Sequence, residues 1–169
     1  MSLKRYTNKS KKKIKVTIIG YGSIGELHLR TLKRFKQIKH FLIITNRNLK
    51  KTNKVTFSNN INSIVSFDPD YIIVSTPNSK HYTNFSFLEK NLRNKIILIE
   101  KPLFHKYILI KEKLKNKYFV NYNLRELNLI KYLKIFIKNK HYFNVFIECS
   151  SYLPNWRTNI GYRESNSGK

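Results

Sequence analysis

Three glycines near the N-terminus have a spacing that suits the binding of a phosphate group. Gly20, Gly22 and Gly25 follow the pattern G-x-G-x-x-G within IKVTIIGYGSIGELH, residues 14–28. The first glycine permits a tight turn, the second lets backbone approach a pyrophosphate, and the third lets a helix pack closely on a strand. The anion then lies on the free N–H groups at the positive end of the helix that follows. The pattern predicts a dinucleotide site, which we favour over a purely structural turn.

Two polar segments follow later apolar runs, where ligand-contacting side chains are expected. They are Ser75-Thr76-Pro77-Asn78 with His81, after YIIV, and Glu100-Lys101-Pro102, after IILI. The carboxyl ends of strands line the ligand crevice of a doubly wound sheet. A lysine directly after a buried strand can have its pKa lowered and exchange a proton with a substrate hydroxyl. We therefore expect Lys101 to take part in chemistry; the alternative is a solvated lysine.

The residues after the second apolar run bear on the choice between NAD and NADP. Asn46 and then Arg47 occupy this position, and no Asp or Glu lies between Glu26 and Asp68. An acidic side chain there would bind the ribose 2′-hydroxyl, whereas an arginine accommodates a 2′-phosphate. We favour NADP(H) over NAD(H). The alternative, that Arg47 is one more solvated cation, has nearly equal weight.

The elements that must position these residues alternate between strand and helix. Apolar runs predict strands at 14–19, 41–46, 55–57, 71–75, 96–100 and 118–123, and apolar spacing predicts helical segments at 24–37, 61–67, 82–91, 104–116 and 124–138. In the first helix, Ile24, Leu27, Thr31 and Phe35 form the expected apolar face. Consecutive apolar residues in the strands are typical of a parallel sheet with both faces covered by helices.

The chain is thus predicted to be an α/β protein with a doubly wound parallel sheet of the Rossmann type. We expect a basic tail at 1–13, a dinucleotide-binding domain at 14–123, and the beginning of an incomplete second α/β domain at 124–169. The last part contains a predicted strand at 142–152.

Composition restricts the classes of function. The chain has 34 Lys and Arg residues against 9 Asp and Glu, a formal charge of +25, so nucleic-acid binding is an alternative. The lysines are spread along the sequence, however, and no nucleic-acid fold pattern accompanies them. Alanine is absent while Lys, Asn and Ile are abundant, as an AT-rich coding sequence would produce. We therefore treat nucleic acid as the lesser alternative.

Targeting signals are also missing from the sequence. No apolar run approaches the roughly 18 residues needed to span a bilayer. The basic N-terminus lacks the apolar segment of a secretory signal. The single Cys149 suits a reducing compartment and is read as a small apolar residue. We expect a cytoplasmic protein that does not enter a membrane.

The ordered motifs together resemble the Gfo/Idh/MocA family of NAD(P)-dependent oxidoreductases. They are GxGxxGxxH (Gly20, Gly22, Gly25 and His28), STPNSKH at 75–81 and EKP at 100–102. The resemblance implies a Rossmann domain, a second α/β domain with a large open sheet, and oxidation or reduction of sugars, inositols and related compounds. NYNLRE at 121–126 looks like the segment that crosses between the domains. NWRTNIGYR at 155–163 is similar to a segment near the cofactor in some members.

The resemblance also implies roles for individual residues. The pyrophosphate would be held by Gly20, Tyr21, Gly22, Ser23, Ile24 and Gly25, and the adenosine ribose would face Asn46 and Arg47. The nicotinamide half would be bordered by Ser75, Thr76, Pro77, Asn78, His81 and Glu100. Lys101 would be the catalytic or substrate-orienting lysine, and Asn123, Arg125, Trp156 and Arg157 would be further candidates to close over the cofactor. His28 is interpreted as a packing residue, His40, His105 and His141 match no motif, and no metal site is assigned.

The sequence departs from the family pattern at its end. Members carry a further histidine, a few residues after an aspartate, as the general acid/base of the second domain, and Lys169 ends this sequence before such a segment. We therefore expect a truncated oxidoreductase acting on a small sugar-like substrate. Two alternatives stay open: a partner chain supplies the missing half, or the chain binds a dinucleotide without catalysis.

Overall fold

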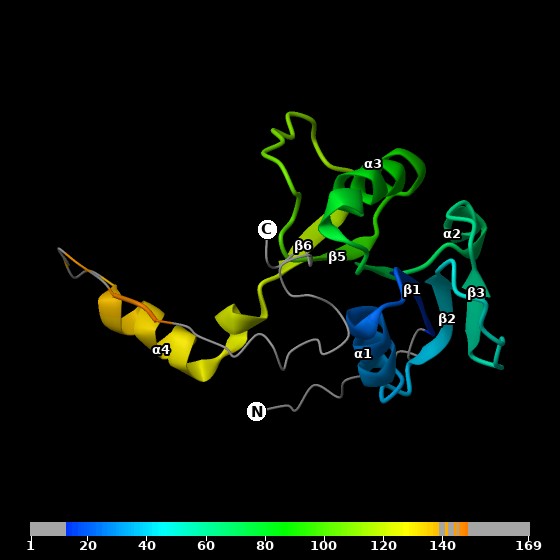
Figure 1. Ribbon diagram of the computed structural model, residues 1–169, viewed down its shortest axis with the longest axis horizontal. Coiled ribbons are helices and arrows are strands. Elements are labelled where there is room, and N and C mark those ends of the chain that lie inside the picture. The colour runs from blue at the N-terminus through cyan, green and yellow to red at the C-terminus, as the bar shows by residue number, and fades with distance from the viewer. Residues whose placement is uncertain (1–12, 139–140, 142–143, 145, 149–169) are drawn as a thin grey trace, which may run out of the picture. The chain divides into compact units, whose positions relative to one another are not determined.

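Six parallel strands form one sheet in the part of the chain that the computed structural model describes (Figure 1). Their order across the sheet is β3-β2-β1-β4-β5-β6. The strands are β1 (Ile14–Ile19), β2 (Ile38–Ile44), β3 (Val55–Ser58), β4 (Tyr71–Val74), β5 (Ile96–Glu100) and β6 (Lys117–Asn121). The order reverses direction between β1 and β4, which is the switch point where a doubly wound sheet binds its ligand.

The described residues are 13–138, 141, 144 and 146–148, and the chain divides into two compact units between Glu126 and Leu127. The first unit contains the sheet with α1 (Ser23–Leu32), α2 (Ser63–Phe67), α3 (His81–Asn91) and the 3-10 turns η1 (Asn78–Lys80) and η2 (Asn123–Glu126). In the second unit, α4 (Asn128–Ile137) is the described helix. None of the described helices combines the length and hydropathy of a membrane span.

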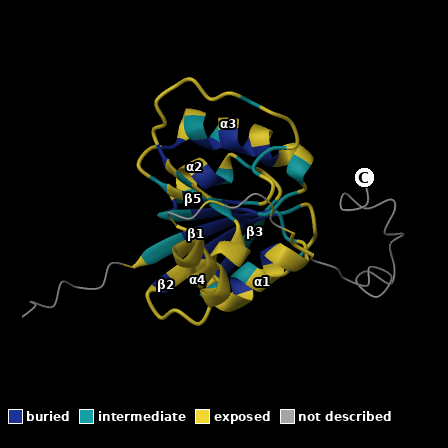
Figure 2. Cartoon of the chain, turned by 90° about the vertical axis from the view of Figure 1, so that its left-hand side faces the viewer, coloured by how far each residue is buried: buried dark blue, intermediate teal, exposed yellow. Residues whose placement is uncertain are grey.

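Helices cover both faces of the sheet, and each face has its own hydrophobic core (Figure 2). α1 packs on one face, where Leu29 joins Val16, Ile18, Phe41 and Ile43. α2 and α3 pack on the other face, where Ile64, Phe85 and Leu88 join alternate strand residues, among them Leu42, Ile72, Ile97 and Ile99. Because successive strand residues point to opposite faces, runs of consecutive apolar residues fill both cores. The predicted doubly wound α/β fold is confirmed.

The first helix differs from its prediction in length and in the face that it buries. α1 ends at Leu32 rather than residue 37, and β2 begins at Ile38 rather than residue 41. Ile24, Leu27, Thr31 and Phe35, the predicted apolar face, are all exposed. Gly25 and Leu29 are buried instead. The prediction was wrong because it weighed side-chain hydropathy alone, whereas the close approach of helix to strand is made at a glycine.

The predicted helix at 104–116 is absent, and β5 is joined to β6 by an irregular segment. Ile108, Leu109 and Ile110 are consecutive, so on a helix they would spread around the axis instead of forming one stripe. Leu103 and Phe104 pack against the core at one end of the connection, and Asn116 is buried at the other. Contacts with the core at its two ends hold this segment in place, and no helix forms between them.

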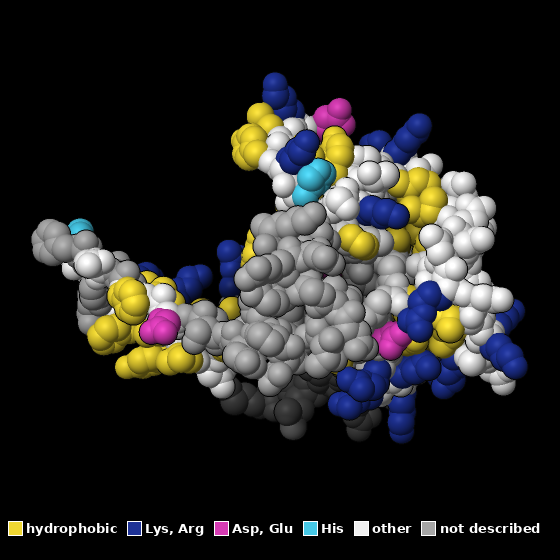
Figure 3. Space-filling model, viewed as in Figure 1, with side chains coloured by type: hydrophobic (Ala, Val, Ile, Leu, Met, Phe, Trp, Pro, Cys, Tyr) yellow, Lys and Arg dark blue, Asp and Glu magenta, His cyan; other side chains and the backbone are white. Residues whose placement is uncertain are grey.

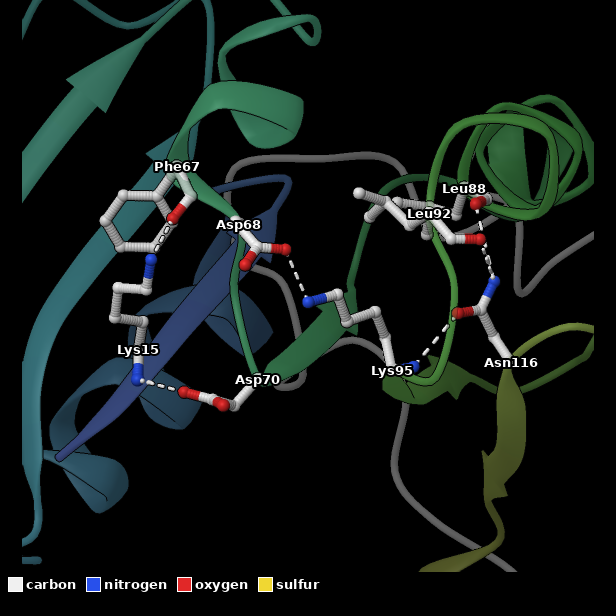
Figure 4. Close-up of polar contacts among 8 residues, drawn as sticks. All are labelled: Lys15, Phe67, Asp68, Asp70, Leu88, Leu92, Lys95 and Asn116. Carbon is white, nitrogen blue, oxygen red and sulfur yellow. Dashed lines mark hydrogen bonds and ion pairs between the residues drawn. The ribbon is translucent and has the colours of Figure 1, made fainter. Parts of the chain in front are cut away.

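Polar contacts brace the amino edge of the sheet, opposite the glycine loop (Figure 4). The Lys15 backbone N–H donates to Asp70 Oδ2 at 3.0 Å, and Lys15 Nζ donates to the Phe67 carbonyl at 2.5 Å. Lys95 Nζ lies 2.5 Å from Asp68 Oδ1, and this hydrogen bond is the main cause that holds the pKa of Asp68 below its ordinary value. These contacts join β1, β4 and β5 at the end of the sheet that lacks the motif residues.

The C-terminal region of the sequence is described only in part. The predicted helix at 124–138 is observed as η2 followed by α4. The predicted strand at 142–152 lies mostly outside the described residues, and residues 144 and 146–148 are in no strand. The predicted tail at 1–13, apart from Lys13, and the segment with Trp156 and Arg157 also lie outside them. The proposed domain boundary after residue 123 stays a prediction.

Candidate functional site

The glycine loop connects β1 to α1 at the carboxyl edge of the sheet, beside the switch point. The Gly20 N–H donates to the Ile44 carbonyl of β2 at 2.9 Å, and Ser75 Oγ, after β4, donates to the Gly20 carbonyl at 2.8 Å. The loop is therefore tied to both strands that flank β1. Its backbone cannot follow another path without breaking these hydrogen bonds.

The three glycines of the loop differ in the space around them. Gly20 has φ +94°, and a Cβ there would lie 2.8 Å from the Ser75 carbonyl carbon. A Cβ on Gly25 would lie 2.2 Å from the Gly20 carbonyl oxygen. A Cβ on Gly22 would meet no atom within 4 Å among the described residues. Two glycines are thus required by the fold itself, and the middle one faces open space.

Gly22 is also the N-cap residue of α1, and no side chain caps this helix. The Glu26 N–H donates to the Gly22 carbonyl, so the helical ladder begins there. The N–H groups of Ser23, Ile24 and Gly25 precede that first bond and have no partner within the helix. A helix N-terminus with free N–H groups and open space before it suits a pyrophosphate. These loop residues therefore fit the phosphate groups of a dinucleotide.

Arg47 and Tyr21 lie together at the side of the loop that faces β2. Arg47 Nη1 donates to the Tyr21 carbonyl at 3.0 Å and to Glu26 Oε1 at 2.6 Å, and the guanidinium carbon lies 5.6 Å from the Tyr21 ring centroid. The rings of Tyr21 and Phe57 form a T-shaped pair with their centroids 5.7 Å apart. Burial and the Glu26 carboxylate raise the pKa of Tyr21, and Arg47 opposes them. Asn46 is exposed beside this group.

The loop after β4 is held by a buried histidine. His81, 1% exposed, places Nδ1 2.8 Å from the Pro102 carbonyl and Nε2 2.9 Å from the Thr76 carbonyl. Thr76 Oγ1 accepts a hydrogen bond from Asn84 Nδ2 of α3 at 2.9 Å. His81 thus connects the loop after β4 to the segment after β5. Pro77 is the N-cap residue of η1, and Asn78 is its first residue.

Glu100, the last residue of β5, joins three elements at the same edge. Its Oε1 lies 2.7 Å from His28 Nε2 of α1 and accepts from Asn121 Nδ2 of β6, also at 2.7 Å. Burial would raise the pKa of Glu100, but the hydrogen bonds from His28 and Asn121 outweigh burial and hold the pKa below its ordinary value. Glu100 is therefore a carboxylate at neutral pH. Lys101 follows it, exposed, and its peptide bond to Pro102 is cis.

The structure brings most predicted site residues together at the carboxyl edge and adds three that were not predicted. The additional residues are Glu26, His28 and Asn121. His28 is part of the GxGxxGxxH motif but was interpreted as a packing residue. Its position three residues after Gly25 could have indicated the helix face that meets the sheet. Asn123 and Arg125 lie in η2, where Arg125 covers the Tyr122 ring at 4.8 Å.

Metal coordination is not indicated at this edge. No group of three or more His, Cys, Asp or Glu side chains within the described ranges is placed to hold a metal ion. The site is instead a glycine loop at a helix N-terminus, with Arg47 on one side and, on the other, Glu100 hydrogen-bonded to His28 and Asn121 and followed by Lys101.

Solved structures with the same fold include oxidoreductases. The WlbA dehydrogenase from Chromobacterium violaceum, in complex with NADH and UDP-GlcNAcA, is 18% identical with a TM-score of 0.62, over 76% of this chain and 41% of its own. The scyllo-inositol dehydrogenase from Lactobacillus casei is 19% identical with a TM-score of 0.61, over 75% and 42%. A candidate NADPH-dependent oxidoreductase from Desulfitobacterium hafniense is 15% identical with a TM-score of 0.60, over 76% and 40%. At these identities the likeness shows the fold.

The chain spans about two fifths of the length of these solved structures. No protein of curated function matches the sequence significantly. The model of the oxidoreductase family with an NAD-binding Rossmann fold, GFO_IDH_MocA, matches residues 14–120, which is more than half of the 169 residues. The chain therefore belongs to the Gfo/Idh/MocA family of oxidoreductases, and the matched region is the family's Rossmann domain for binding a nicotinamide dinucleotide.

Proposed function

We propose that this chain binds NADP(H), in preference to NAD(H), across the glycine loop. The observation that supports this most is the contrast among the three glycines. Gly20 and Gly25 are closed in by backbone, while Gly22 faces open space at the uncapped N-terminus of α1. A pyrophosphate in that space would accept hydrogen bonds from the first turn of the helix. The proposed contacts are Gly20, Tyr21, Gly22, Ser23, Ile24 and Gly25.

The proposed preference for NADP(H) depends on Arg47. Its Nη1 is used by Tyr21 and Glu26, and its Nη2 and Nε have no protein partner among the described residues. This edge of a guanidinium can bind a phosphate through two parallel hydrogen bonds. Asn46 offers no carboxylate to repel a 2′-phosphate. The relatives include both an NADH complex and a candidate NADPH-dependent enzyme, so the preference is argued from Arg47 alone.

The nicotinamide half is proposed to lie over the loops after β4 and β5. Ser75, Thr76, Pro77, Asn78 and Glu100 would border it, and the buried His81, hydrogen-bonded to carbonyls of both loops, would hold them in place. A bound nicotinamide supplies or accepts a hydride. Lys101 Nζ would hold the substrate oxygen and exchange its proton.

A small sugar-like molecule is the proposed substrate class. The solved relatives include a dehydrogenase in complex with a UDP-sugar and an inositol dehydrogenase. The hydroxyl groups of such molecules are the groups that a lysine beside a nicotinamide can orient. Binding of the dinucleotide and turnover are separate parts of the proposal, and each has its own test.

Thermal melting with each nucleotide and a turnover assay test the two parts. We expect NADPH to raise the Tm of the full chain more than NADH does, because only NADPH carries the 2′-phosphate. With a panel of UDP-sugars and inositols, Lys101→Met should lower turnover at least about 100-fold while NADPH affinity stays within about twofold. Lys106→Met, an exposed lysine on the following segment, is the matched control.

Four results would contradict parts of the proposal. Equal Tm shifts would remove the NADP preference, and no shift with either nucleotide would remove the cofactor site. Nucleotide binding without turnover of any substrate would leave a dinucleotide-binding protein without catalysis. Turnover that survives Lys101→Met would remove the proposed role of this lysine.

A further inference from the structure

We infer that Glu26 is a specificity-determining residue, which weakens the preference for NADP(H) by partly neutralising Arg47. This inference rests on the proposed function, because it concerns the group that would meet the 2′-phosphate. Glu26 is outside the glycine pattern and outside the end of β2, so neither sequence feature assigns it a role. Its place in the fold is the first turn of α1, directly beside Arg47.

The contact between the two side chains is short and shared with the glycine loop. Arg47 Nη1 lies 2.6 Å from Glu26 Oε1 and 3.0 Å from the Tyr21 carbonyl, so both of its hydrogens are used. The guanidinium also covers the Tyr21 ring, which forms a T-shaped pair with Phe57. Three contacts thus fix the position of the guanidinium, while its Nη2 and Nε edge stays open for a ligand.

Glu26 exerts two opposite effects on a 2′-phosphate at that open edge. As a hydrogen-bond acceptor it orients Arg47, which lowers the entropy lost on binding. As a negative charge within a few ångströms of the phosphate it repels the same ligand. The side chains are 55% and 47% exposed, so water weakens the ion pair but leaves a repulsion worth a few-fold in affinity.

Replacing Glu26 by glutamine separates these two effects. The glutamine side-chain carbonyl can still accept the hydrogen bond from Arg47 Nη1, whereas the negative charge is gone. NADH has no 2′-phosphate at the ribose, so the same replacement should leave its binding nearly unchanged. The inference therefore predicts that Glu26→Gln raises the affinity for NADPH and leaves the affinity for NADH unchanged.

Arg30 and Lys33 are the other charged groups near Glu26. They lie one and two turns further along α1 and line a shallow cavity of about 410 Å³ together with Tyr21, Ser23 and Glu26. A phosphate held by these two side chains would also be sensitive to the Glu26 charge. Removing Arg47 distinguishes the two cases, because an effect through Arg30 and Lys33 would persist without it.

The experiment measures Kd for NADPH and NADH by nicotinamide fluorescence at low ionic strength. It compares the wild type with Glu26→Gln, Arg47→Gln and the double variant. We expect Glu26→Gln to bind NADPH about three- to fivefold more tightly and NADH within about 1.5-fold of the wild type. The gain should shrink as salt is raised from about 50 to 500 mM. In the Arg47→Gln background the gain should disappear.

Glu112→Gln is the matched control, since Glu112 is an exposed glutamate on the segment after β5 and the charge change is the same. A similar gain with this control would show a general charge effect and overturn the inference. Unchanged or weaker NADPH binding by Glu26→Gln, an equal gain for NADH, or a gain that survives Arg47→Gln would each overturn it as well. If the wild type binds neither nucleotide, the proposed function fails and the inference fails with it.

Discussion

Glu100 shows how single residues connect distant segments at this site. It accepts hydrogen bonds from His28, 72 residues earlier, and from Asn121, 21 residues later. Hydrogen bonds to a charged group contribute more to stability than those between neutral groups. Because Lys101 follows Glu100 directly, the same two bonds also position the proposed catalytic lysine relative to α1.

Replacing His28 by alanine tests this connection. We expect the free energy of unfolding to fall by about 1–2 kcal/mol, since a half-buried carboxylate loses one of its two side-chain donors. The pKa of Glu100 should rise, because His28 is one of the groups that hold it low. Urea unfolding measures the first effect, and NMR titration of the Glu100 carboxyl carbon measures the second.

His40→Ala is the control for this prediction. His40 is an exposed histidine on β2, so its replacement should change the free energy of unfolding by less than about 0.5 kcal/mol. An unchanged pKa of Glu100 in His28→Ala would show that the 2.7 Å contact does not act on the carboxylate.

The spacing of residues predicted some of the site and missed the rest for a physical reason. Gly20, Gly22 and Gly25 are close in sequence, so one local pattern indicates a turn, an open position and a helix contact. Glu26 with Arg47 and His28 with Glu100 meet only after the sheet has formed. Their interactions depend on tertiary distance, which hydropathy and spacing along the chain do not contain.

At the scale of elements, β1 is an enclosed strand that leads into the site. It lies between β2 and β4, and its Thr17 is fully buried among apolar neighbours, with Leu42 and Ile72 beside it in register. The Thr17 hydroxyl has no hydrogen-bond partner among the described residues. A buried polar group without a partner costs about 1–3 kcal/mol of stability.

Thr17→Val should therefore stabilise the protein by about 0.5–1 kcal/mol, because valine has the same shape without the hydroxyl. Urea unfolding is the measurement. Thr17→Ser separates the two groups on Cβ: it keeps the hydroxyl, loses a buried methyl, and should destabilise by about 1 kcal/mol. A loss of stability in Thr17→Val would show that the hydroxyl has a partner, such as a bound water.

Strands were easier to predict than helices in this chain, and the reason lies in their environment. The central strands β1, β2, β4 and β5 are short apolar runs with residues in both cores, so hydropathy alone identifies them. The segment at 104–116 also contains apolar residues, but it folds as an irregular connection. What decides its structure is where Leu103 and Asn116 are anchored, which the local pattern does not indicate.

At the scale of the whole molecule, charge and function are separate properties. Lysine and arginine side chains occur at several separate places on the face seen in Figure 3, not in one patch. The site residues instead gather where β1, β4 and β5 end. This edge combines a helix N-terminus, an arginine and a lysine. We therefore ascribe the binding of an anionic dinucleotide to this edge and not to the net positive charge of the chain.

The most direct test of the central claim is the affinity of the Gly22→Asp variant for NADPH, measured by calorimetry. Gly22 has φ −89°, and a side chain there meets no described atom, so the chain can accept aspartate. Asp is a favourable N-cap residue and should keep or raise the Tm. The same carboxylate would lie where the pyrophosphate is proposed to bind, so affinity should fall about 100-fold or more.

Gln37→Glu, an exposed residue between α1 and β2, adds the same charge at the opposite edge of the sheet and should leave the affinity within about twofold. Loss of NADPH binding in Gly22→Asp alone, with an unchanged or higher Tm, is the result that the proposed site predicts. Wild-type affinity in a folded Gly22→Asp variant would contradict it.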